Sequence, residues 1–84
     1  MAEVVYSARA LEHIERAQAV VAIQSAVNTL AAHPLIGRRV EGELRELVIS
    51  YGQTGYVAFY RHVIARDEVR ILAIRHQREL GFLP

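Results

Sequence analysis

The order of apolar and polar residues predicts a strand, then a helical segment, at the start of the chain. Glu3–Tyr6 holds an apolar triplet typical of a short strand, and Ser7 follows as a residue whose hydroxyl favours the position before a helix. From Ala8 to Ala32 no glycine or proline interrupts a helical pattern. The His33–Pro34 pair ends it, because the residue before proline avoids the helical region.

The apolar positions in this helical segment change sides part-way along it. At about 100° per residue, Ile14 and Val21 fall on one side, whereas Ile23 and Leu30 fall roughly opposite. One straight helix would carry two opposite apolar faces, but two antiparallel helices would bury both on one sheet. Such helices need a connector of about 2–8 residues. The pattern favours two helices that meet near residues 17–21, through a very tight junction or a connector missing from the sequence.

The second half of the chain predicts a loop followed by three antiparallel strands. The loop is Leu35–Gly42, with a glycine at position 37 and another at its end. Branched and aromatic residues mark the strands, and glycines or polar residues mark the turns between them. The expected order is strand Leu44–Ser50, hairpin Tyr51–Gly55, strand Tyr56–Val63, turn Ala65–Glu68 and strand Val69–His76, with Gln77–Pro84 as a tail. The fold class is therefore α+β, in one domain over residues 1–84.

The last predicted strand combines an apolar first half with ionisable residues at its end. Its first half, Val69–Ile74, is a branched apolar run typical of a strand buried on both faces. Arg75, His76, Arg78 and Glu79 follow at once, and ionisable groups are rarely buried. The pattern predicts that this strand carries a basic cluster to one rim of the sheet.

Composition limits the class of protein. The chain has 84 residues, 52% of them hydrophobic, no cysteine and a net charge of +1. No apolar run reaches the roughly 18 residues that span a bilayer, and the start lacks the pattern of a signal peptide, so we expect a cytoplasmic protein. All ten basic residues are arginine. The four histidines have no metal-binding spacing, so we expect neither a metal site nor a cofactor.

Several stretches resemble the toxins of type II toxin–antitoxin, or plasmid stabilisation, systems in the RelE/ParE superfamily. The similar stretches are VVYSARALEHIERA, AIQSAVNTLAAHPLIGRRVEG, LRELVISYGQTGYVAFYR and VRILAIRHQRELGF. The most specific are HP-x-x-GR, at His33, Pro34, Gly37 and Arg38, and the sequence RHQRE at Arg75–Glu79. The resemblance implies a small sheet with a helical hairpin on one face, and a longer hairpin junction than this chain has.

The resemblance implies a growth inhibitor that a co-expressed, ParD-like antitoxin neutralises, and it leaves two mechanisms open. ParE-like members inhibit DNA gyrase by binding, without chemistry of their own. RelE-like members cleave mRNA on the ribosome, with arginine or lysine on the scissile phosphate and another side chain moving protons. In that branch an arginine usually stands in the middle strand, where this chain has Val57. This difference favours the ParE side, with the mRNA endonuclease as the alternative.

The candidate site residues follow from these two hypotheses. For a nuclease they are Arg61, Arg75, His76 and Arg78, although alternation along a strand sends Arg75 and His76 to opposite faces. For binding to the antitoxin or the target they are Arg45, Tyr51, Arg61, Arg75 and Arg78. Each arginine has an alternative role in an internal ion pair, such as Arg75 with Glu46 or Glu79. A third hypothesis, a scaffold without toxic action, predicts that expression leaves growth unaffected.

Overall fold

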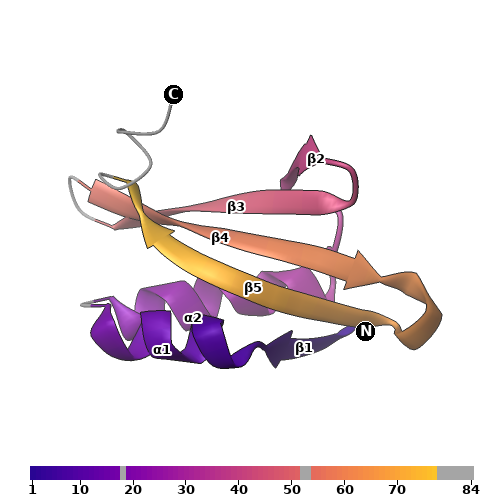
Figure 1. Ribbon diagram of the computed structural model, residues 1–84, viewed down its shortest axis with the longest axis horizontal. Helices are drawn as coiled ribbons and strands as arrows, with labels where there is room; N and C mark the ends of the chain where they lie inside the picture. Colours follow the sequence, from indigo (N-terminus) through magenta and orange to yellow (C-terminus); the bar gives the residue numbers. More distant parts are fainter. Residues whose placement is uncertain (18, 52–53, 78–84) are drawn as a thin grey trace.

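The computed structural model describes residues 1–17, 19–51 and 54–77, which form two helices and one five-stranded mixed sheet (Figure 1). The helices are α1 (Ala8–Arg16) and α2 (Val20–Asn28). The strands are β1 (Glu3–Tyr6), β2 (Arg38–Glu41), β3 (Leu44–Tyr51), β4 (Thr54–Val63) and β5 (Glu68–His76). Both helices lie on one side of the sheet, so the predicted α+β class is confirmed. No helix of the described residues is long and apolar enough to cross a membrane.

The two predicted helices are present, with α1 ending at Arg16 and α2 beginning at Val20. Ser7 caps α1, its hydroxyl accepting a hydrogen bond from the Ala10 amide at 3.1 Å. The junction runs from Ala17 to Ala19, and residue 18 lies outside the described residues. The predicted apolar phase is only partly right, because Val21 is 80% exposed on α2.

The sheet has the order β1-β5-β4-β3-β2, so the first strand lies beside the last. β1 is parallel to β5, and the other neighbours are antiparallel. β1 ends opposite Ile71. Beyond that point, Ser7 and α1 lie beside the edge of β5 and bond its backbone. The Ser7 hydroxyl donates to the Leu72 carbonyl at 3.1 Å, and His13 Nδ1 accepts from the Ile74 amide at 3.0 Å. These bonds fix α1 against the sheet.

The core lies between the helices and one face of the sheet, which we call the covered face. Ile23, Val27 and Leu30 come from the second helix and the turn after it, and none has measurable exposure. They meet alternate residues of the strands, among them Ile49, Ala58, Tyr60, Val69, Ile71 and Ile74. Val57 is also buried, at 4% exposure, but it does not belong to this cluster.

Two sequence predictions were wrong. The stretch Leu35–Gly42 is not all loop, because Arg38–Glu41 pairs with β3 as an edge strand. All four of its residues are exposed and a bulge interrupts its register, so its sequence carries no alternation to detect. The β5 strand is not buried on both faces either. Val69 and Ile71 are buried, whereas Arg70 between them is exposed on the other side of the sheet.

Candidate interaction surface

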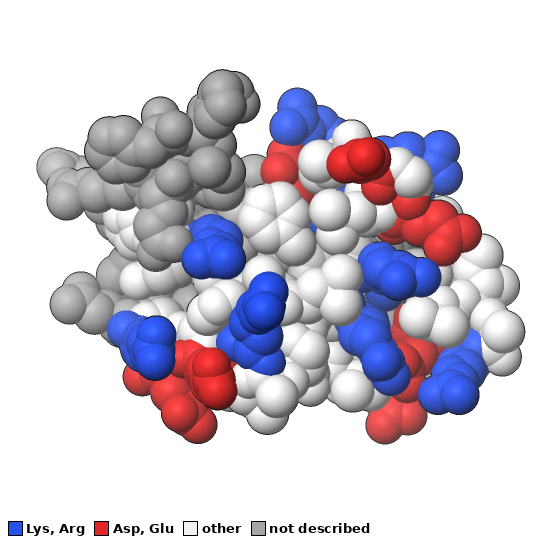
Figure 2. All heavy atoms as spheres, viewed as in Figure 1, with Lys and Arg blue, Asp and Glu red and all other residues white. Residues whose placement is uncertain are grey.

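The face of the sheet turned away from the helices, which we call the open face, carries two of the candidate residues, Arg61 and Arg75. Alternation along the strands and the cross-strand register place its members. They are Arg38, Glu46, Val48, Val57, Phe59, Arg61, Glu68, Arg70, Ala73 and Arg75. Figure 2 shows basic side chains on both sides of a neutral strip, with acidic side chains mostly towards the margins of the view. The open face is thus a mixed apolar and basic surface.

Two ion pairs on the open face are strongly asymmetric in exposure. Arg38 Nη2 lies 2.5 Å from Glu46 Oε1, with side-chain exposures of 79% and 15%. Arg70 Nη2 lies 3.1 Å from Glu68 Oε2, with exposures of 47% and 13%. In both pairs the glutamate side chain is mostly buried and the arginine side chain is the more exposed member. The surface offered to a partner is therefore more positive than the balance of charges indicates.

A third basic residue adds to this positive character. Arg61 on β4 stands directly opposite Arg70 on β5. Like charges in directly opposed positions repel each other and destabilise a sheet. Arg61 is offset only by Glu43, at 3.7 Å, and both of these side chains are more than half exposed.

The loop that leads into β2 is fixed in place although Leu35 and Ile36 in it are exposed. The Gly37 amide donates to the Tyr60 hydroxyl at 2.8 Å, and Arg45 Nη1 donates to the carbonyls of Gly37 and Leu35 at 2.9 and 3.3 Å. A side chain at Gly37 has no room, because a Cβ there would lie 2.5 Å from the Tyr60 hydroxyl. Leu35 and Ile36 are nevertheless 58% and 61% exposed. Exposed aliphatic side chains on a fixed loop suit contact with a partner.

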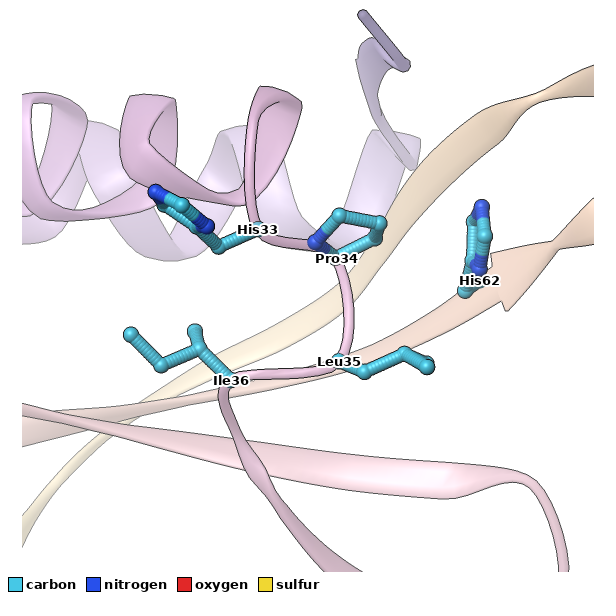
Figure 3. A pocket seen from close by; sticks show the side chains of 5 residues that line it. All are labelled: His33, Pro34, Leu35, Ile36 and His62. Carbon is cyan, nitrogen blue, oxygen red and sulfur yellow. The ribbon is translucent and has the colours of Figure 1, made fainter.

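A hollow of about 410 Å³ lies at this loop (Figure 3). Four consecutive loop residues, His33 to Ile36, line it together with His62 of β4. Neither ring nitrogen of His62 has a hydrogen-bond partner among the residues that the structure describes, and its Nε2 lies 3.7 Å from Asp67, too far for a hydrogen bond. The described residues contain no group of three or more His, Asp or Glu side chains that could hold a metal ion.

Burial changes the acidity of two tyrosines on the covered face. It raises the pKa of Tyr60, although the bond from Gly37 and the charge of Arg45 partly oppose the shift. Burial also raises the pKa of Tyr6, whose hydroxyl has no hydrogen-bond partner in the described residues. The Tyr60 side chain is fully buried, and its hydroxyl positions the loop by accepting the hydrogen bond from the Gly37 amide.

The structure separates the predicted site residues. Arg61 and Arg75 lie on the open face, both exposed. Arg45 is bonded to loop carbonyls, so it has a structural task in addition to any contact with a partner. The side chain of Tyr51 and all of Arg78 lie outside the described residues.

Arg75 and His76 lie on opposite faces of the sheet, as alternation along a strand predicts. Arg75 is paired in register with Val57 on the open face, and His76 with Tyr56 on the covered face. The rings of His76 and Tyr56 meet edge to face, with centroids 5.1 Å apart. The suggested partner of Arg75, Glu46, instead pairs with Arg38.

Sequence reasoning missed several residues of this surface. Arg70 was hidden inside an apolar run, although its alternation with Val69 and Ile71 was a usable signal. Leu35 and Ile36 were assigned to a loop without a role. Their exposure depends on the bond from Gly37 to Tyr60, which joins residues 23 positions apart.

Comparison with known proteins identifies the family. The family model of the ParE toxin of the type II toxin–antitoxin system parDE matches residues 4–81. A curated relative, Toxin RelE3 of Caulobacter vibrioides, is 44% identical over 57 residues, which cover 68% of this chain and 60% of that protein. The aligned part therefore spans less than two thirds of the relative.

Solved structures show the same fold. The toxin–antitoxin complex RelBE of E. coli contains a chain that matches with a TM-score of 0.75 and 12% identity, over 89% of this chain and 95% of that one. The isolated E. coli RelE toxin also matches with a TM-score of 0.75 and 12% identity, over 90% of this chain and 84% of its own. The family match over nearly the whole chain, together with this fold, shows that the protein belongs to the ParE toxin family, in the RelE/ParE superfamily of type II toxins.

Proposed function

We propose that this toxin inhibits growth by binding a macromolecular target, DNA gyrase as in the ParE-like branch, and that it does not cleave mRNA. The observation that carries the proposal is the absence of a convergent catalytic group among the described residues. A nuclease of this kind needs a phosphate-binding cation and a proton-transferring side chain around one reacting phosphate.

The nuclease candidates do not meet such a requirement. His76 lies on the covered face and Arg61 and Arg75 on the open face. Arg75 is opposite Val57 on β4. Val57 lies four residues before Arg61, so Arg75 and Arg61 are separated by about 13 Å along the strand direction. Val57 itself, at the position of the expected arginine, is buried and apolar. The arrangement supports binding rather than phosphodiester chemistry.

We further propose that a cognate, ParD-like antitoxin neutralises the toxin. The E. coli relative of the same fold was solved in complex with its antitoxin. In this chain the fixed loop exposes Leu35 and Ile36, and the open face exposes arginines. An antitoxin segment with apolar and acidic side chains fits both features, since such segments commonly fold on their partner.

One observation keeps the alternative function in view. The curated relative with 44% identity is named a RelE toxin. An RelE-like endonuclease would act on ribosome-bound mRNA.

Two assays on the purified toxin separate the functions. Inhibition of gyrase-catalysed DNA supercoiling, with mRNA left intact in a translation extract, is the expected result. Ribosome-dependent mRNA cuts that disappear in Arg75→Ala would overturn the proposal. A matched variant, Arg16→Ala on α1, controls for the loss of one positive charge, since Arg16 is exposed and lies outside the open face.

A further inference from the structure

The structure points to a specific docking site for the antitoxin: we infer that an acidic segment lies across the open face and binds Arg38, Arg61 and Arg70, in competition with the toxin's own Glu43. The inference rests on the proposed antitoxin and names the chemistry of its contact. Arg70 and Arg38 were not among the candidates that the sequence provided.

Charge complementarity identifies the occupant. The side chains of Glu46 and Glu68 are only 15% and 13% exposed, while those of their partners Arg38 and Arg70 are 79% and 47% exposed. A partner therefore meets cations, and the anions that balance them lie beneath. Arginine offers a planar fork that matches a carboxylate in two parallel hydrogen bonds.

The surface between the arginines favours a peptide over a nucleic acid. Phe59 and Ala73, both half-buried, lie in the cross-strand row of Arg38, beside the row of Arg61 and Arg70, and Val48, 56% exposed, lies in the next row. Such a surface accepts aliphatic side chains between the charges, whereas binding to a phosphate backbone depends on the number of cations alone. A second hollow, of about 480 Å³, adjoins this surface, and its walls combine the apolar Ile36 and Val48 with the charged Arg38 and Glu46.

Glu43 is the internal competitor. Its carboxylate lies 3.7 Å from Arg61, and it is 76% exposed, unlike Glu46 and Glu68. A partner carboxylate that approaches Arg61 meets repulsion from Glu43. Removing this negative charge should therefore strengthen binding, a result that misfolding does not produce.

The experiment measures binding of the purified protein encoded by the open reading frame adjacent to the toxin gene. Arg61→Gln and Arg70→Gln should each weaken the complex about two- to fivefold, and the double variant about tenfold. Glu43→Gln should tighten it about twofold, but not when Arg61 is already glutamine. Glu12→Gln on α1 removes the same charge from an exposed site outside the open face, so it should have no such effect. The wild-type affinity should fall as salt rises from 50 to about 500 mM, because exposed charges are screened.

The outcomes are distinguishable. If the adjacent protein does not bind at all, the proposed antitoxin function fails together with the inference. If it binds tightly, and neither salt nor the substitutions at Arg61, Arg70 and Glu43 change the affinity, the docking site is wrong and the proposed function stands. If the arginine variants instead lose binding to a 20-nucleotide RNA or DNA probe and keep the protein complex, the open face binds nucleic acid, which also overturns the inference.

Discussion

The two faces of the sheet are made from the same strands but follow different physical rules. On the covered face, Tyr60, Val69 and Ile71 have no measurable exposure, and their packing supplies most of the stability. On the open face, the neighbouring positions Arg61 and Arg70 are exposed like charges that oppose each other directly. Stability alone does not explain the second arrangement. Residues one position apart along a strand therefore contribute differently: one packs in the core, and the other forms part of an exposed charged surface.

The largest expected difference comes from replacing one branched aliphatic residue by threonine on each face. Ile71→Thr on the covered face should lower the free energy of unfolding by about 2–4 kcal/mol, because it leaves space and buries a hydroxyl. Val48→Thr, at 56% exposure on the open face, should change it by less than about 0.5 kcal/mol. Urea denaturation measures both. Equal losses in the two variants would show that the open face also serves as a packed layer.

A smaller contrast lies within the covered face. Tyr60→Phe leaves the buried Gly37 amide without its acceptor and should cost about 1–3 kcal/mol. Tyr6→Phe removes a hydroxyl without a hydrogen-bond partner and should be close to neutral. Thermal unfolding compares the two variants. A neutral Tyr60→Phe would mean that the loop does not depend on this bond.

Alkaline pH tests the same tyrosines. Burial raises the pKa of both above the ordinary value of 10.0. The folded protein then keeps protons that the unfolded chain loses, so this stability is present below about pH 10 and is lost as pH rises further. The chain has no lysine or cysteine, whose side chains would also titrate in this pH range. Unfolding measured from pH 8 to 11 should show the decline, and Tyr60→Phe should reduce its slope, whereas an unchanged slope would contradict the assignment.

The smallest effect concerns the opposed arginines. Arg61→Gln removes a like-charge contact and should raise stability by about 0.2–0.5 kcal/mol at low salt. The gain should vanish near 1 M salt, where charges are screened within about 3 Å. Denaturation at the two salt concentrations measures it. A loss of stability at low salt would show that the exposed pair with Glu43 outweighs the repulsion.

Local signals in the sequence were sufficient for most of the fold. The strand Glu3–Tyr6, the cap at Ser7 and the three later strands were placed within a few residues, because apolar runs and turn residues are local features. β2 was missed, since an exposed edge strand such as Arg38–Glu41 is defined by backbone pairing rather than by side-chain burial.

The candidate site was less accessible from sequence. Alternation placed Arg75 and His76 on opposite faces, as the register shows. The exposed position of Arg38 above Glu46 depends on side-chain packing across two strands, which no local pattern encodes. The fixed loop likewise depends on a bond between Gly37 and Tyr60, which the fold brings together.

The parallel pairing of β1 with β5 has a consequence for folding during translation. β1 is synthesised first and pairs with β5, which is synthesised last. The sheet is therefore complete only after residue 76 has been synthesised. Contacts so distant along the chain are slow to form, because a long loop must close first. An interrupted translation product therefore lacks the complete five-stranded sheet.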